Sequence, residues 1–207
     1  KDGSWKNLMD RKNSSADASP TASQMPRLLG LALASKLYRK NTDLHDLTSF
    51  SNKGNEVAFG TIGDASTSEG LFFETINAAG VLQVPMVMSV WDDGHGISVP
   101  KKYQTTKESI SEILKGFEET EEKSGYKIYK VKGWDYPGLC QTYLDATNYA
   151  RKHHTPVLIH VEEVTQPQGH STSGSHERYK SKERLEWEKE YDGIAQFRKW
   201  ILGYKKE

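Results

Sequence analysis

The sequence has almost no cysteine, no long apolar run and no excess of charge of either sign. Its single cysteine, Cys140, excludes an intramolecular disulfide and a zinc site built from several cysteines. Lys plus Arg and Asp plus Glu both number 28, so the formal net charge is zero and no general attraction to nucleic acid is expected. No apolar stretch approaches the ~20 residues that a membrane-spanning helix needs. We therefore expect a cytoplasmic protein with neither nucleic acid nor a membrane as its partner.

The length and the ends of the chain bear on its domain organisation. A chain of 207 residues is long enough for one α/β domain around a single core. Residues 1–20 are rich in Ser, Asn, Asp and Lys and show little periodicity, so we expect an irregular segment there and a single domain over 21–207. The chain opens on Lys1 without an initiator Met, which favours a fragment of a longer protein.

Short apolar runs alternate with helical patterns along the chain. This alternation predicts a doubly wound, mostly parallel α/β sheet with helices on both faces. The expected strands cover 56–62, 85–91, 126–131 and 156–161, and the expected helices cover 24–40, 68–83, 137–151 and a stretch after 180.

Three local features of these helices are also predicted. The first helix is apolar on nearly every face, which indicates that it is buried. Residues 66–69 have the form of a capping box before the second helix. The last helix is expected to carry one apolar stripe and two ion pairs on its wetter side. The stripe is Trp187, Tyr191, Ile194, Phe197 and Ile201, and the pairs are Lys182 with Glu186 and Arg184 with Glu188.

Acidic residues follow two of the expected strands. Asp64 comes after the first strand, and Asp92 and Asp93 follow the next. The carboxyl ends of parallel strands meet at one edge of the sheet, so these carboxylates should face one crevice. Such oxygens suit Mg²⁺, and a helix beginning near Ser66 would offer free N–H groups to an anion. The residues alone leave two interpretations open: a metal and diphosphate site, or acidic strand ends that bind nothing.

A longer pattern resembles a known family. Gly63-Asp64-Ala65, a spacer over 66–91 and Asp92-Asp93 resemble the thiamine diphosphate motif of Gly-Asp-Gly, a similar spacer and Asn-Asn. Further matching motifs lie at 19–24, 68–70, 74–79, 96–100, 169–173 and 192–194. Together they make nearly the whole chain similar to the alpha-type, decarboxylating first component of the branched-chain 2-oxo acid and pyruvate dehydrogenase complexes.

This resemblance implies a fold, two cofactors and an oxidoreductase activity. The fold would be the diphosphate-binding type of the thiamine diphosphate-binding fold, and the cofactors would be thiamine diphosphate and Mg²⁺. The activity would be oxidative decarboxylation of a 2-oxo acid with acyl transfer to lipoamide.

The resemblance also assigns roles to residues of this chain. Asp64 and Asp93 would bind Mg²⁺ through their side chains and His95 through its backbone carbonyl, while His170 would help to handle the acyl group and its transfer. A plain surface role stays open for both histidine side chains. The diphosphate would lie against Gly63, Asp64, Ala65, Ser66 and Gln166.

The family's partners are implied as well. A beta-type pyrimidine-binding domain would supply the activating glutamate, either from a separate subunit or from a missing C-terminal part of a fused chain. A lipoyl-bearing acyltransferase would accept the acyl group, and the assembly would be a homo- or hetero-oligomer. The 207 residues alone would then be inactive.

Three departures from the family pattern bear on cofactor affinity. Ala65 replaces the second glycine, Asp92-Asp93 replaces the asparagine pair, and Gln166 stands where relatives have an arginine that holds the diphosphate. Asp93 and Gln166 together make the site more anionic, unless a cation such as Lys101 or Lys102 compensates. Two alternatives therefore stay open: a catalytically silent half of such an assembly, and a transketolase-like thiamine enzyme.

Overall fold

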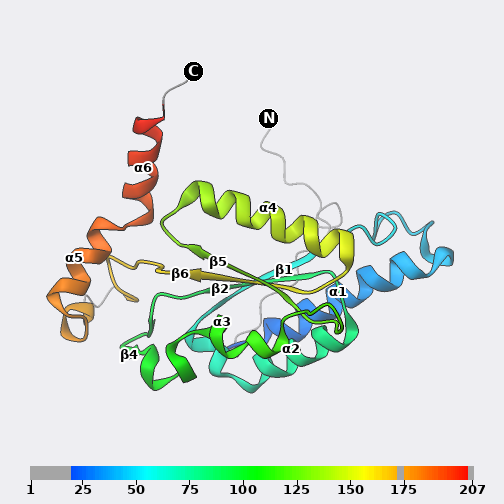
Figure 1. Ribbon diagram of the computed structural model, residues 1–207, viewed down its shortest axis with the longest axis horizontal. Coiled ribbons are helices and arrows are strands. Elements are labelled where there is room, and N and C mark those ends of the chain that lie inside the picture. Colours follow the sequence, from blue (N-terminus) through cyan, green and yellow to red (C-terminus); the bar gives the residue numbers. More distant parts are fainter. Residues whose placement is uncertain (1–19, 172–174, 205–207) are drawn as a thin grey trace.

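The computed structural model describes residues 20–171 and 175–204, and its centre is a parallel sheet (Figure 1). The four strands lie in the order β1 (Ala58–Gly63), β2 (Met86–Trp91), β6 (Val157–Glu162) and β5 (Lys127–Lys132). All three pairings are parallel, and Ala58 to Gly63 face Met86 to Trp91 in register. The predicted strands are confirmed, with ends displaced by one or two residues. The expected irregular segment 1–20 lies, except for Pro20, outside the described residues.

Helices cover both faces of this sheet, which confirms the doubly wound class. α1 (Gln24–Lys40) and α2 (Gly70–Leu82) lie on one face, and α4 (Tyr136–His153) lies on the other (Figure 1). Successive residues of a strand point to opposite faces, so Met86, Met88 and Val90 pack toward α1 and α2 while Val87 packs with residues of α4. None of the described helices is long and apolar enough to cross a membrane.

α1 packs on one side only, so the prediction that it is buried is wrong in this respect. Its buried residues, Met25, Leu28, Ala32 and Ser35, follow helical spacing along one face. Leu31 and Leu37, on the rest of the helix surface, are 41% and 52% exposed. The helix lies on the outside of the sheet next to α2 and β1, so only one stripe of it has neighbours to pack against.

The turn after β1 differs from the predicted capping box. Residues Ala65–Ser68 form a 3-10 turn, Glu69 is extended, and α2 begins at Gly70 without a side-chain cap. Both the backbone N–H and the hydroxyl of Thr67 donate to the carbonyl of Asp64, at 3.1 and 2.6 Å. The chain therefore makes a separate tight turn next to Asp64 before the helix starts.

Short elements connect β2 to β5. β3 (His95–Gly96) and β4 (Val99–Pro100) form a small antiparallel ribbon directly after the acidic residues. α3 (Ile110–Ile113) follows, and Ile110 and Leu114 complete the core on the side of α1 and α2. The 3-10 turns within residues 20–171 and 175–204 are η2 (Thr42–Leu44), η3 (Ala65–Ser68), η4 (Lys101–Tyr103), η5 (Thr106–Glu108), η6 (Lys115–Phe117) and η7 (Ser175–Arg178).

The C-terminal stretch forms two helices, whereas its apolar stripe predicted a single one. α5 (Lys182–Glu190) ends at Tyr191, and Asp192 caps α6 (Gly193–Gly203) by accepting from the backbone N–H of Ala195 at 2.9 Å. The break divides the stripe, and Ile194 is 81% exposed. The Arg184–Glu188 pair forms, but Glu188 is fully buried, so this side of α5 is not the wetter one.

Candidate functional site

A pocket of about 390 Å³ lies at the carboxyl ends of β1 and β2. The structure brings every site residue predicted from the sequence to its wall. These residues are Gly63, Asp64, Ala65, Ser66, Asp93, His95, Gln166 and His170. Thr21, Trp91, Gly96, Ile97 and Val164 complete the lining. The pocket is therefore assembled from the N-terminal end of the described chain, the two acidic turns and the segment after β6.

Asp64 is the least satisfied acidic group in this wall. Its side chain is 6% exposed, and its Oδ2 atom has no hydrogen-bond partner. Burial, followed by repulsion from Asp92 and Asp93, raises the pKa of Asp64 to about 7. A buried carboxylate with one unsatisfied oxygen, in a pocket that it shares with a second carboxylate, fits a divalent cation.

The turn after β2 presents Asp93 and His95 together. The Oδ1 atoms of Asp92 and Asp93 accept from the backbone N–H groups of Gly94 and His95, at 2.9 and 3.0 Å. Gly94 has a φ of +80°, in the left-handed region that favours glycine. The His95 ring lies 5.9 Å from the ring of Tyr179, so the side chain has a packing role whether or not its carbonyl binds a metal.

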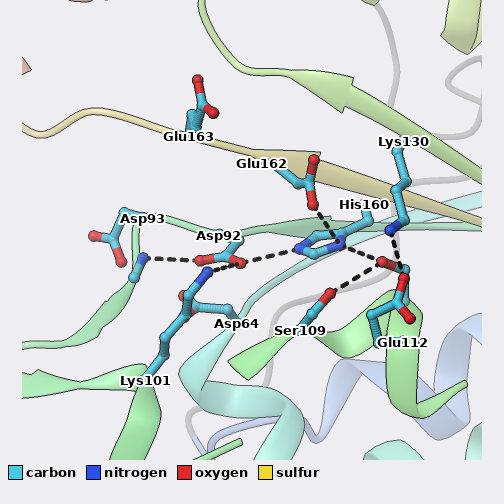
Figure 2. A network of polar contacts seen from close by, with 12 residues as sticks. Asp64, Asp92, Asp93, Lys101, Ser109, Glu112, Lys130, His160, Glu162 and Glu163 are labelled. Carbon is cyan, nitrogen blue, oxygen red and sulfur yellow. Dashed lines mark hydrogen bonds and ion pairs between the residues drawn. The ribbon is translucent and has the colours of Figure 1, made fainter. Parts of the chain in front are cut away.

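Asp92 does not face the pocket, although the sequence places it beside Asp93. It is 3% exposed and accepts from Lys101 Nζ at 2.8 Å and from His160 Nε2 at 3.0 Å. Figure 2 shows Asp92 between these two groups, with the carboxylate of Asp93 turned away from them. Burial alone would raise the pKa of Asp92, but hydrogen bonds from His160 and Lys101 hold it below its usual value.

These contacts bear on whether Lys101 or Lys102 could offset the extra negative charge of the site. Lys101 neutralises Asp92, so its charge is already used inside the fold. Lys102 lies over the ring of Tyr103, with Nζ 4.9 Å from the ring centroid. No lysine or arginine lines the pocket in the part of the chain that the structure describes.

His160 is a buried member of this network that the sequence analysis missed. It is fully buried, and its Nδ1 atom lies 2.8 Å from the hydroxyl of Ser111. The signal that could have identified it is a single imidazole inside the apolar run of β6, where a polar group needs a partner. Its partner is Asp92, the residue directly before the proposed metal ligand.

Ala65 fits its position without backbone strain. It lies in a 3-10 turn and is not among the residues with positive φ, so this turn does not need the freedom of glycine. A Cβ atom added to Gly96 would lie 2.9 Å from the Cβ of Ala65, so the two turns pack closely here. The methyl group therefore takes up space at the seam between them.

The segment after β6 carries Gln166 and His170. The carbonyl of Gln166 accepts from the N–H of Gly169 at 2.9 Å, and Gly169 has a φ of +75°. A Cβ atom there would lie 2.5 Å from His176 Nδ1, so the turn requires glycine for space as well. His170 is exposed at the pocket wall, while Thr172 and Ser173 lie outside the described residues.

The donor set resembles a shared metal site more than a closed protein cage. Across 20–171 and 175–204, no group of three or more His, Cys, Asp or Glu side chains is arranged to hold a metal. Two carboxylates and a carbonyl leave several positions of an octahedral ion open, and Mg²⁺ in proteins commonly fills these with water and ligand phosphates. The residues present therefore fit an ion that is bound together with a diphosphate.

A second cavity, of about 560 Å³, lies between α1 and β1 and lacks this chemistry. Its carboxylate, Glu56, already accepts from the hydroxyl of Ser51 at 2.7 Å. Most of its other lining is apolar or aromatic, including Leu31, Phe50 and Phe59. The smaller pocket is therefore the candidate site.

Fold and pocket define a class of open parallel α/β proteins whose site lies at the carboxyl ends of adjacent strands. Within that class, residues 1–204 match the family described as "Dehydrogenase E1 component", and the chain belongs to this family. The resemblance seen in the sequence motifs is thereby confirmed.

Several curated relatives carry alpha-subunit names. "2-oxoisovalerate dehydrogenase subunit alpha 2, mitochondrial" of Arabidopsis thaliana is 30% identical over 87% of this chain and 34% of its own length. "2-oxoisovalerate dehydrogenase subunit alpha" of Bacillus subtilis is 26% identical over 89% and 49%. "Pyruvate dehydrogenase E1 component subunit alpha" of Rickettsia bellii is 26% identical over 86% and 48%. The chain spans about a third to a half of these relatives.

A solved structure supports the fold. Transketolase from Campylobacter jejuni superposes with a TM-score of 0.56 at 18% identity, over 85% of this chain and 26% of that one. At this identity the likeness concerns the arrangement of strands and helices alone.

Proposed function

We propose that this chain is the metal- and diphosphate-binding half of the active site of a 2-oxo acid dehydrogenase first component. The observation that carries the proposal is the buried Asp64 carboxylate, one oxygen of which has no hydrogen-bond partner, in one pocket with Asp93. The function is oxidative decarboxylation of a 2-oxo acid with acyl transfer to lipoamide. Thiamine diphosphate, when bound, supplies the electron sink for loss of CO₂.

The side chains of Asp64 and Asp93 and the backbone carbonyl of His95 would hold Mg²⁺. Because burial raises the pKa of Asp64 to about 7, part of the Asp64 population holds a proton at neutral pH and would have to release it to bind the cation. The turn of Gly63, Ala65 and Ser66 lies against the diphosphate. This assignment gives the unsatisfied carboxylate the partner that its surroundings lack.

Gln166 and His170 contact the cofactor from the segment after β6. The Gln166 side chain gives the diphosphate a neutral hydrogen-bond donor in the place of a cation. The exposed ring of His170 would hold or donate a proton at the acyl group during its transfer. Trp91, Ile97 and Val164 supply the apolar part of the wall.

The other half of the site belongs to a beta-type pyrimidine-binding domain, in a separate subunit or in a further part of a fused chain. The family membership supports this part of the proposal. A lipoyl-bearing acyltransferase is the proposed acceptor partner, and residues 21–207 are proposed as one domain of a longer, oligomeric protein. The isolated 207 residues are expected to be inactive. The cytoplasmic location stays a prediction.

A catalytically silent half is the second candidate function, favoured by the absence of a lysine or arginine from the described pocket wall. Calorimetric titration of the complete assembly with Mg²⁺ and thiamine diphosphate separates the two candidates. Saturable binding, with turnover of pyruvate, 2-oxoglutarate or 3-methyl-2-oxobutanoate, supports the active enzyme. Absence of binding in an assembled, folded complex supports the silent one.

His170 has its own test in the complete enzyme. His170→Ala is expected to spare Mg²⁺ binding and to slow complex activity by about a hundredfold to ten-thousandfold, the usual cost of removing a positioned acid or base. Decarboxylation measured with an artificial acceptor should fall less, because it omits the transfer to lipoamide. Wild-type rates in both assays would place His170 outside catalysis.

A further inference from the structure

Three charged residues form a cluster beside the turn that carries Asp93: Lys180 and Glu188 are buried, and Arg184 is partly exposed. Glu188 is fully buried, and Lys180 Nζ lies 2.8 and 2.9 Å from its two carboxylate oxygens. Arg184 Nε lies 2.8 Å from Oε1 of the same carboxylate. Buried charges are tolerated only with good geometry and satisfied hydrogen bonds, and this cluster has both. Two cations facing one carboxylate leave one positive charge in excess.

The positively charged guanidinium of Arg184 lies against the turn that contains Asp93. Its Nη2 atom donates to the backbone carbonyl of Asp93 at 2.7 Å, and its Cζ atom lies 4.8 Å from the centroid of the Trp187 ring. Nε is held by Glu188, so three different parts of the planar group are engaged at once. A lysine could not reproduce this arrangement, because it has no planar fork.

The same stretch of chain contacts the neighbouring residue of the turn. Tyr179, directly before Lys180, packs its ring against the ring of His95. Tyr179 and Arg184 therefore contact His95 and Asp93, yet neither lines the pocket. They act on the turn from its outer side, just after the segment that carries Gln166 and His170.

We propose that Arg184, fixed by Glu188 and Lys180, is a positioning residue for the metal turn. By holding the carbonyl of Asp93, it orients the short turn so that the Asp93 carboxylate and the His95 carbonyl reach one ion. This inference rests on the proposed function, because it takes Asp93 and His95 as ligands. Metal affinity then depends on a residue that touches neither metal nor cofactor.

The test uses the full-length protein with its partner and Mn²⁺ as the probe, titrated by electron paramagnetic resonance with thiamine diphosphate present. Arg184→Met keeps the aliphatic stem and removes the fork, and it is expected to weaken Mn²⁺ binding by about 10- to 100-fold, as for other outer contacts of metal ligands. Activity should recover at saturating Mn²⁺. Arg184→Lys should lie between Arg184→Met and wild type. Lys189→Met, an exposed change on the same helix, should bind like wild type.

The outcomes separate this inference from the proposed function. If Arg184→Met binds Mn²⁺ as tightly as wild type, the positioning role is overturned and the proposed function is unaffected. The same holds if Arg184→Met loses activity that saturating Mn²⁺ does not restore. If the unaltered protein binds no Mn²⁺ with thiamine diphosphate, the proposed function and this inference both fail. If Arg184→Met does not fold by circular dichroism, Arg184→Lys decides: weaker binding supports the role, and unchanged binding overturns it.

Discussion

The turns after β1 and β2 each bury an aspartate, and the two aspartates are satisfied in opposite ways. Asp92 is saturated, with Lys101 and His160 on one oxygen and the N–H of Gly94 on the other. Asp64 has an oxygen with no partner. Accordingly, the pKa of Asp92 is held below its usual value, and that of Asp64 is raised to about 7.

This difference separates a supporting residue from a candidate ligand. A buried carboxylate whose partners are all protein groups contributes to the fold and has no capacity left for a ligand. A buried carboxylate left short of a partner destabilises the fold until something binds to it, and such sites cluster where proteins function. The two neighbouring strand ends therefore carry one structural and one functional acid.

Removing the charge of the functional acid should have the largest effect. Asp64→Asn is expected to lower Mg²⁺ affinity by more than the about 10- to 100-fold that the loss of an outer contact costs. The metal-free protein should at the same time become more stable at pH 8, by on the order of 3 kcal/mol, because the raised pKa of Asp64 reports unfavourable ionisation.

Calorimetric titration and thermal unfolding measure both changes in the same samples. Glu69→Gln, an exposed change in the same turn, is the matched control and should leave both unchanged. A variant that binds Mg²⁺ like wild type would contradict the assignment of Asp64 as a ligand.

Removing a hydrogen-bond partner of Asp92 should leave it, like Asp64, as a buried carboxylate that destabilises the fold. Lys101→Met leaves Asp92 buried without its cation, and we expect a loss of about 2–4 kcal/mol in the free energy of unfolding. The double variant Asp92→Asn with Lys101→Met should recover most of this loss, because no buried charge is left to compensate. Denaturant unfolding of the three proteins provides the values. Equal losses in the single and the double variant would show that Lys101 acts through packing instead.

The comparison also shows what the sequence could and could not predict. The strands, their parallel arrangement and the meeting of Asp64 with Asp93 at one edge follow from apolar runs and from the geometry of parallel sheets. The separation of Asp92 from Asp93 does not, because it depends on Lys101 and His160, which reach Asp92 from distant parts of the chain. Adjacent residues in a turn point in different directions, and only the tertiary contacts decide which one faces the pocket.

The prediction of one continuous helix in the C-terminal stretch was wrong for a related reason. Its apolar residues fit a single helical stripe, but Asp192 can cap a new helix, and this local hydrogen bond divides the stripe. The burial of Glu188 likewise depends on Lys180, which precedes α5 and is not part of any helical pattern. Periodicity describes one helix at a time and contains no information about such partners.

The pH dependence of metal binding should follow Asp64. Only the ionised carboxylate binds the cation, so affinity should be constant well above pH 7 and fall about tenfold for each pH unit below it. The stability of the metal-free protein should have the opposite trend. The folded state holds the Asp64 proton up to about pH 7, whereas the unfolded state releases it near 3.8, so this contribution decreases as the pH rises between these values. Titrations at pH 6, 7 and 8 test the first trend, and an affinity that is the same at all three pH values would contradict the assignment.

The smallest expected effect comes from adding the cation that the pocket lacks. Gln166→Arg would place a guanidinium in the wall that Asp64 and Asp93 share, where it can contact the diphosphate. Because the position is only half buried, we expect a gain of about 1 kcal/mol, or roughly fivefold in thiamine diphosphate affinity at saturating Mg²⁺. The added charge should also lower the apparent pKa for metal binding, since it reduces the repulsion that Asp93 exerts on Asp64. Gln168→Arg adds the same charge at an exposed position outside the pocket wall and is the matched control. If both variants bind thiamine diphosphate equally, the gain comes from the added net charge and not from a contact in the pocket. The difference between Asp64 and Asp92 would then bear on the metal ion alone and not on the diphosphate.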